Sequence, residues 1–158
     1  MEGQGTTFVL YLLAGDPAGK PAVTSLSATS STDLSGKRIL IAEDEASLAQ
    51  LLHSLLTPLK AQLVQVQDGQ AALEAVLAQD FDLIISDIEM PRMNGLQLYQ
   101  EIASRRPHLT ARMVLVTGES INELSEKRMK GIKAHLLYKP FSRAELLGTL
   151  SRLLASQA

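Results

Sequence analysis

Short apolar runs alternate with longer amphipathic stretches from residue 38 to near the end of the chain. Short, mostly apolar runs of this kind suit strands that are buried on both faces of a parallel sheet. They predict strands over 38–42, 63–66, 82–87, 113–116 and 136–138. Between and after these runs, the spacing of apolar residues predicts helices over 46–59, 69–78, 96–104, 120–130 and 142–154.

This alternation of strand and helix is typical of an α/β fold. Right-handed crossovers then give a doubly wound five-stranded parallel sheet, flavodoxin-like, with strand order 2-1-3-4-5. Ser142 is followed three residues later by Glu145, which predicts a capping box at the start of the closing helix.

The first 36 residues have a different composition. Residues 15–36 are rich in Gly, Pro, Ala, Ser and Thr, and we assign 14–36 to a flexible linker. The apolar run 8–14 does not fit a signal peptide, because Glu2 and no basic residue precedes it, and it is too short for a membrane helix. The folded domain is therefore expected over 37–156, and no membrane contact is expected from this chain.

Polar side chains follow four of the predicted strands. Glu43 and Asp44 follow the first strand, Asp87 ends the third, Thr117 follows the fourth and Lys139 follows the fifth. Each of these residues alone is more typical of a turn or a cap. In an open parallel sheet, however, chemistry occurs at the carboxyl ends of the strands, so their joint occurrence favours a functional site.

With this set of strand ends, residues 37–156 resemble the receiver (response regulator) domain of two-component signalling. The resemblance implies that Asp87 accepts a phosphoryl group from a phosphohistidine, that Thr117 hydrogen-bonds it and that Lys139 pairs with it. It also implies a Mg²⁺ ion held by Asp44, Asp87 and the backbone carbonyl of Glu89, with Glu43 acting through water, and oxygen ligands are those that Mg²⁺ prefers.

Two further details follow from the resemblance. The Lys139–Pro140 bond is expected to be cis. Leu136 stands where receivers usually have a switch aromatic, and Tyr138 lies on the same strand face, so whether Tyr138 substitutes stays open.

The N-terminal segment Gly3-Gln4-Gly5-Thr6-Thr7-Phe8 looks like the last glycine-rich box of a histidine kinase ATP-binding domain. We therefore interpret residues 1–13 as the remnant of such a domain and the chain as the C-terminal receiver of a hybrid histidine kinase. The expected partners are a histidine kinase or a histidine phosphotransfer protein, and the expected location is the cytoplasm.

Composition excludes little but agrees with this interpretation. The chain has 158 residues, a net charge of -2 and no Cys. The cluster Lys127-Arg128-Met129-Lys130 follows Glu123 and Glu126, which is typical of a solvated helix face and does not favour nucleic acid.

Three alternatives are weighed against the favoured function. The chain could be a stand-alone response regulator with residues 1–36 as a tail, or a hydrolase that forms a transient phosphoaspartate, for which Glu89 is the candidate general acid or base. A phosphoryl relay through His53 is disfavoured, because His53 lies among leucines on a helix.

Overall fold

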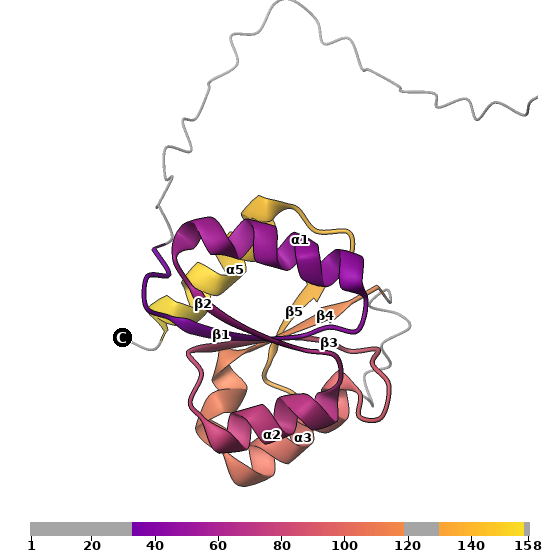
Figure 1. The fold of residues 1–158 in the computed structure, drawn as a ribbon. Coiled ribbons are helices and arrows are strands. Elements are labelled where there is room, and N and C mark those ends of the chain that lie inside the picture. Colours follow the sequence, from indigo (N-terminus) through magenta and orange to yellow (C-terminus); the bar gives the residue numbers. More distant parts are fainter. Residues whose placement is uncertain (1–32, 119–129, 157–158) are drawn as a thin grey trace, which may run out of the picture. The chain divides into compact units, whose positions relative to one another are not determined.

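Five parallel strands form the centre of the computed structural model, which describes residues 33–118 and 130–156 (Figure 1). The strands are β1 (Arg38–Ala42), β2 (Gln62–Val66), β3 (Leu83–Asp87), β4 (Met113–Thr117) and β5 (His135–Tyr138). Their order in the sheet is β2-β1-β3-β4-β5, and each neighbouring pair is parallel. The predicted fold class and strand order are confirmed.

Helices cover both faces of this sheet. They are α1 (Ala46–Leu56), α2 (Gly69–Ala78), α3 (Gly95–Arg105) and α5 (Arg143–Ala155), with 3₁₀ turns η1 (Thr57–Leu59) and η2 (Pro107–Arg112). The first helix was expected to reach residue 59, but its α-helical part ends at Leu56. Pro58 lacks a backbone N–H, and the chain tightens into η1 there. The helix predicted over 120–130 lies almost wholly outside the described residues.

Two apolar layers hold the helices to the sheet. Leu40, Ile84 and Leu115 point to the face covered by α2 and α3, where Val76 and Leu98 are fully buried. Their strand neighbours point to the other face and pack against buried leucines of α1 and α5; among them are Ile39, Ile85, Val116, Leu52 and Leu150. Figure 1 shows α1 and α5 on one side of the sheet and α2 and α3 on the other. Burial on both faces explains the mostly apolar runs in the sequence.

Polar caps fix where three helices begin. Asp68 accepts a hydrogen bond from the backbone N–H of Ala71, and Asn94 accepts one from that of Gln97. Ser142 and Glu145 form the expected capping box at the start of α5. Such caps satisfy backbone N–H groups that have no partner within the helix. They therefore fix the residue at which each of these helices begins.

The folded domain begins earlier than the sequence predicts. Leu34, assigned to the linker, is fully buried with the α1 and α5 residues. The backbone N–H of Lys37 donates to the Leu34 carbonyl at 2.9 Å, and Gly36 supplies the positive φ of 75° that this turn needs. The expectation failed because one leucine in a polar stretch carries no periodicity. The kinase remnant assigned to residues 1–13 and residues 14–32 of the assigned linker lie outside the described residues.

Across the two described stretches, 33–118 and 130–156, no helix is both long and apolar enough to cross a membrane.

Candidate functional site

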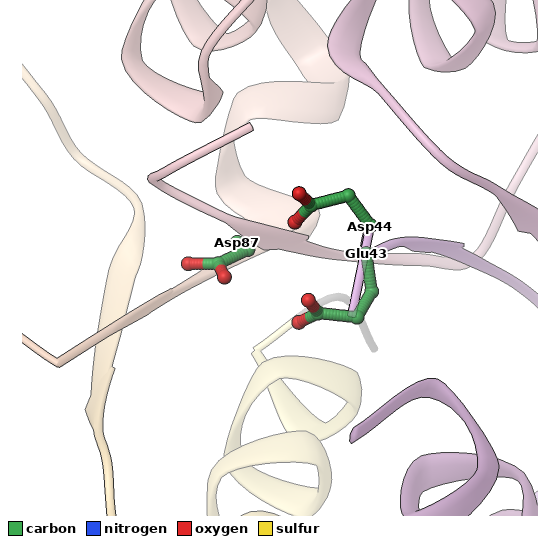
Figure 2. A group of neighbouring side chains, drawn as sticks. All are labelled: Glu43, Asp44 and Asp87. Carbon is green, nitrogen blue, oxygen red and sulfur yellow. The ribbon is translucent and has the colours of Figure 1, made fainter. Parts of the chain in front are cut away.

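The predicted site residues meet at the carboxyl ends of the central strands. Glu43 and Asp44 follow β1, and Asp87 is the last residue of β3, which pairs with β1. Thr117 ends β4, the other neighbour of β3, and is fully buried. Figure 2 shows the three carboxylates gathered where β1 and β3 end. The sheet order therefore brings acids from two strands together beside the end of a third.

Glu43, Asp44 and Asp87 form an acidic cluster. One carboxylate oxygen from each lies within 4.8 Å of the other two. Glu43 and Asp87 are 2% and 6% exposed, whereas Asp44 is open to solvent. Buried carboxylates this close need positive charge near them, because solvent cannot screen their repulsion. An all-oxygen donor set with one open side fits Mg²⁺, which keeps several of its waters.

Lys139 supplies part of that positive charge. Its Nζ lies 2.7 Å from Oδ2 of Asp87 and 3.8 Å from Oε2 of Glu43. The backbone N–H of Lys139 donates to the Thr117 carbonyl at 2.7 Å, which continues the pairing of β4 and β5 past the end of β5. The Lys139–Pro140 peptide bond is cis, as the resemblance implies.

The environment of Glu43 raises the pKa of its carboxyl group. Burial is the main cause, and the neighbouring charges of Asp87 and Asp44 act in the same direction. The backbone N–H of Glu45, which donates to Glu43 Oε1 at 3.0 Å, and the Lys139 ammonium oppose the shift only in part. A cation bound among these acids would favour the ionised form of Glu43.

The turn after β3 is held close to the site by backbone contacts. The backbone N–H of Ile88 donates to the Val116 carbonyl at 2.9 Å, and that of Glu89 donates to Asp87 Oδ1 at 3.3 Å. The backbone N–H of Gly95 returns to the Ile88 carbonyl at 2.9 Å. A Cβ on Gly95 would lie only 2.3 Å from the Asp87 carbonyl oxygen, so this approach requires glycine.

Gly95 is a site residue that our sequence reasoning missed. In the sequence, Asn94-Gly95 indicates only a turn between the third strand and the helix that follows it. The signal that could have identified it is its place between a strand that ends in Asp87 and the first turn of α3.

Leu136 and Tyr138 are both half-buried on the α2 and α3 face. Tyr138 lies opposite Thr117 in the β4–β5 register, whereas Leu136 lies opposite Leu115. The position beside Thr117 therefore belongs to Tyr138, and its part in switching stays a prediction.

The three histidines lie away from these strand ends. His53 is within α1, His108 is in η2 and His135 is the first residue of β5. β5 starts at the opposite edge of the sheet from the acidic cluster. The placement of His53 within α1 agrees with the sequence argument against a phosphoryl relay through it.

A parallel doubly wound sheet with three acids, a threonine and a lysine at its carboxyl edge defines the receiver class of signalling domains. The family model for the response regulator receiver domain matches residues 39–151. The chain therefore belongs to this family.

Similar curated proteins and solved structures agree with this family assignment. The chain is 39% identical over 113 residues to the transcriptional regulatory protein PdtaR of Mycobacterium tuberculosis, which covers 70% of this chain and 53% of that protein. It is 39% identical over 104 residues to the regulator of RpoS of Escherichia coli K12, covering 66% and 31% of the two chains. The chain thus spans about half or less of the length of these relatives.

Two solved structures contain the cation that the site fits. The receiver domain of sensor histidine kinase PA1611 from Pseudomonas aeruginosa, with magnesium coordinated in its active site cleft, matches at a TM-score of 0.70 and 26% identity. That match covers 77% of this chain and 99% of the other. The response regulator TrrA from Thermotoga maritima, in complex with Mg²⁺-BeF, matches at 0.66 and 30% identity over 75% and 99% of the chains.

Proposed function

We propose that this domain takes a phosphoryl group from a phosphohistidine onto Asp87. The observation that carries the proposal is the Asp87 carboxylate at the tip of β3, 2.7 Å from the Lys139 ammonium and grouped with two further acids. An Asp87 oxygen attacks phosphorus, the P–N bond to the donor imidazole breaks, and the imidazole nitrogen takes a proton. The product is an aspartyl phosphate.

The chain's own residues act mainly by placing charge. Lys139 orients Asp87 and then faces the phosphoryl oxygens, while Thr117 at the end of β4 is placed to hydrogen-bond them. Asp44, Asp87 and the Glu89 carbonyl would hold Mg²⁺, with Glu43 acting through water. When bound, the ion offsets the negative charge that gathers on the transferring group.

We propose a histidine kinase or a histidine phosphotransfer protein as the donor. An apolar groove beside the site supports this proposal. Its walls come from the start of α1 and from the residues after β5, and it is lined by Glu45, Ser47, Leu48, Leu51, Lys139, Pro140 and Phe141. Leu51 is 45% exposed there. A helix that carries the phosphohistidine could pack on this groove with its imidazole facing Asp87.

We also propose that residues 1–13 are the end of a kinase ATP-binding domain and that the parent protein is a hybrid histidine kinase. The glycine-rich segment 3–8 and the matched receiver domain of a sensor kinase support this. The reading frame upstream of Met1 tests it: an in-frame kinase core is the expected result, and its absence would favour a stand-alone regulator.

Labelling tests the phosphoacceptor directly. The protein is incubated with Mg²⁺ and a small phosphodonor, and the modified residue is mapped after borohydride trapping. We expect modification at Asp87 and its loss in Asp87→Asn. Labelling that persists in Asp87→Asn, or that maps to another residue, would overturn the assignment.

A further inference from the structure

The turn between β3 and α3 contacts the turn between β2 and α2. The backbone N–H of Gly69 donates to the Met93 carbonyl at 3.1 Å. A Cβ on Gly69 would lie 2.3 Å from that carbonyl oxygen, so the approach needs glycine. Next to this contact, the Arg92 guanidinium forms an ion pair with the Asp68 carboxylate. Residues 92 and 93 thus both contact residues 68 and 69.

Asp68 is a buried carboxylate with both oxygens in use. Its side chain is 2% exposed. Oδ1 caps α2 by accepting from the backbone N–H of Ala71 at 2.9 Å, and Oδ2 accepts from Arg92. Among the residues that the structure describes, Arg92 is the only basic side chain paired with Asp68. Only the Asp68 side of the pair is buried, so removing the Arg92 guanidinium would leave the buried Asp68 carboxylate without a countercharge.

Arg92 adopts a backbone conformation that is unfavourable for a residue with a side chain. Its φ is 64°, in the left-handed region that favours glycine and asparagine. The side chain is 69% exposed, so packing in the core does not impose this conformation. The ion pair with Asp68 and the Met93–Gly69 hydrogen bond offset its cost.

The other end of the same turn carries the site. Residues 88–94 run from Asp87 to Gly95, and the hydrogen bond from Gly95 to Ile88 closes the turn beside the strand tip. In the chain, Glu89, whose carbonyl is the proposed backbone ligand of Mg²⁺, lies between Ile88 and Arg92. The Gly95–Ile88 hydrogen bond joins the two ends of the turn, and the contacts of Arg92 and Met93 hold its middle. Weakening the contacts of the middle would leave the Glu89 carbonyl less well oriented, because outer partners orient the groups that ligate a metal.

We propose that Arg92, through its ion pair with Asp68, is a positioning residue that holds the β3–α3 turn ready to bind the divalent cation. The inference rests on the proposed function of the site, because the cation is the ion that phosphoryl transfer requires. Nothing in the sequence alone indicates it, since the two partners are 24 residues apart.

The first experiment uses the metal-free protein. Amide hydrogen exchange is compared in the native chain and in Arg92→Ala at a temperature where both are folded. We expect the Gly69 and Gly95 amides to lose about tenfold or more of their protection, because opening of the turn exposes both. Amides within β3 should keep theirs. Unchanged protection at Gly69 and Gly95 would overturn the proposal.

The second experiment is a Mg²⁺ titration by calorimetry. Arg92→Ala should weaken Mg²⁺ binding by about three- to tenfold. Loss of a group that orients a metal ligand typically costs about 10–100-fold in affinity, and we expect a smaller effect here because the Met93–Gly69 hydrogen bond remains. Arg92→Lys keeps the charge and should restore part of the affinity. Arg105→Ala is the matched control: it removes an exposed arginine paired with Glu101 within α3 and should leave Mg²⁺ binding unchanged.

A double variant separates positioning from stability. Asp68→Asn keeps the cap on Ala71 but removes the buried charge, so Arg92→Ala combined with Asp68→Asn should recover the melting temperature lost in Arg92→Ala without recovering Mg²⁺ affinity. Recovery of both together would mean that Arg92 acts only on stability and would overturn the proposal. If the native protein bound no Mg²⁺ and was not labelled by the phosphodonor, the proposed function itself would fail. Equal Mg²⁺ binding by the native protein and by Arg92→Ala would instead contradict only the role of Arg92.

Discussion

At the scale of single residues, the site places three carboxylates, two of them buried, beside the Lys139 ammonium. Glu43 shows the imbalance most clearly, because burial and its acidic neighbours raise its pKa although Lys139 lies 3.8 Å away. Without a divalent cation, the folded domain therefore holds an ionised Glu43 at a cost that the unfolded chain does not have.

Glu43→Gln should stabilise the metal-free protein at neutral pH. A carboxyl group whose folded pKa is raised destabilises the fold above that pKa, and the penalty disappears as pH falls to the ordinary value of 4.5. Glutamine keeps an oxygen for the Glu45 N–H. Urea unfolding with a chelator should show a gain at pH 7 that fades near pH 4. Equal stability at pH 7 would contradict the assigned burial cost.

At the scale of elements, α3 begins in close contact with the end of β3. Gly95 begins α3 with no room for a side chain, whereas Gly148 lies within α5 with no atom within 4 Å of a built Cβ. The same substitution should therefore have opposite effects at the two positions.

Gly95→Ala should destabilise the domain and weaken Mg²⁺ binding, because the new methyl group meets the Asp87 carbonyl. Gly148→Ala should stabilise it by about 0.5–1 kcal/mol, since alanine loses less backbone freedom in a helix. Thermal melts of both variants, with Mg²⁺ titrations, provide the comparison. A Gly95→Ala variant with native stability and affinity would show that α3 can shift away from β3 without cost.

At this scale, the sequence predicts well the features that depend on a local pattern of residues. Strand limits agree within a residue or two because buried strands are mostly apolar runs, and Ser142 with Glu145 predicts the start of α5. Glu43, Asp44, Asp87 and Lys139 could be expected to meet because strand ends of a parallel sheet share one edge. Gly95 and the Arg92–Asp68 pair could not, since they depend on the approach of turns far apart in the chain.

At the scale of the whole molecule, two exposed leucines distinguish the faces of the domain. Leu51 lies on α1 in the groove beside Lys139, and Leu77 is 38% exposed on α2, on the opposite face of the sheet. If the groove receives the donor protein, Leu51 matters for transfer and Leu77 does not.

Leu51→Asp should slow transfer from a phosphorylated donor protein about tenfold or more, because apolar contact area is lost and a like charge is added beside the acidic site. Labelling by a small phosphodonor should stay near native. Leu77→Asp is the control and should leave both rates unchanged. Equal slowing of both reactions in Leu51→Asp would point to damage of the site itself and not to a docking surface.

The limits of the domain make a second prediction at this scale. A chain that starts at Asp33 should match the full chain in melting temperature and labelling, as we propose for a domain preceded by a linker. Leu34→Ala in that chain should cost about 2–5 kcal/mol, the usual cost for a fully buried leucine. Urea unfolding measures both. A truncated chain that melts several degrees lower would show that residues before 33 belong to the fold.

The burial of Leu34 has a consequence for how the domain is tethered. Leu34 precedes β1, so the preceding chain is anchored at the pole where the parallel strands begin, and Asp87 lies at the pole where they end. The strands are five residues long, which separates the two poles by roughly 16 Å. Leu34 therefore joins the preceding chain to the fold at the pole opposite Asp87. An insertion before residue 33 should accordingly leave labelling of Asp87 by a small phosphodonor unchanged, because it enters the fold at the far ends of the strands.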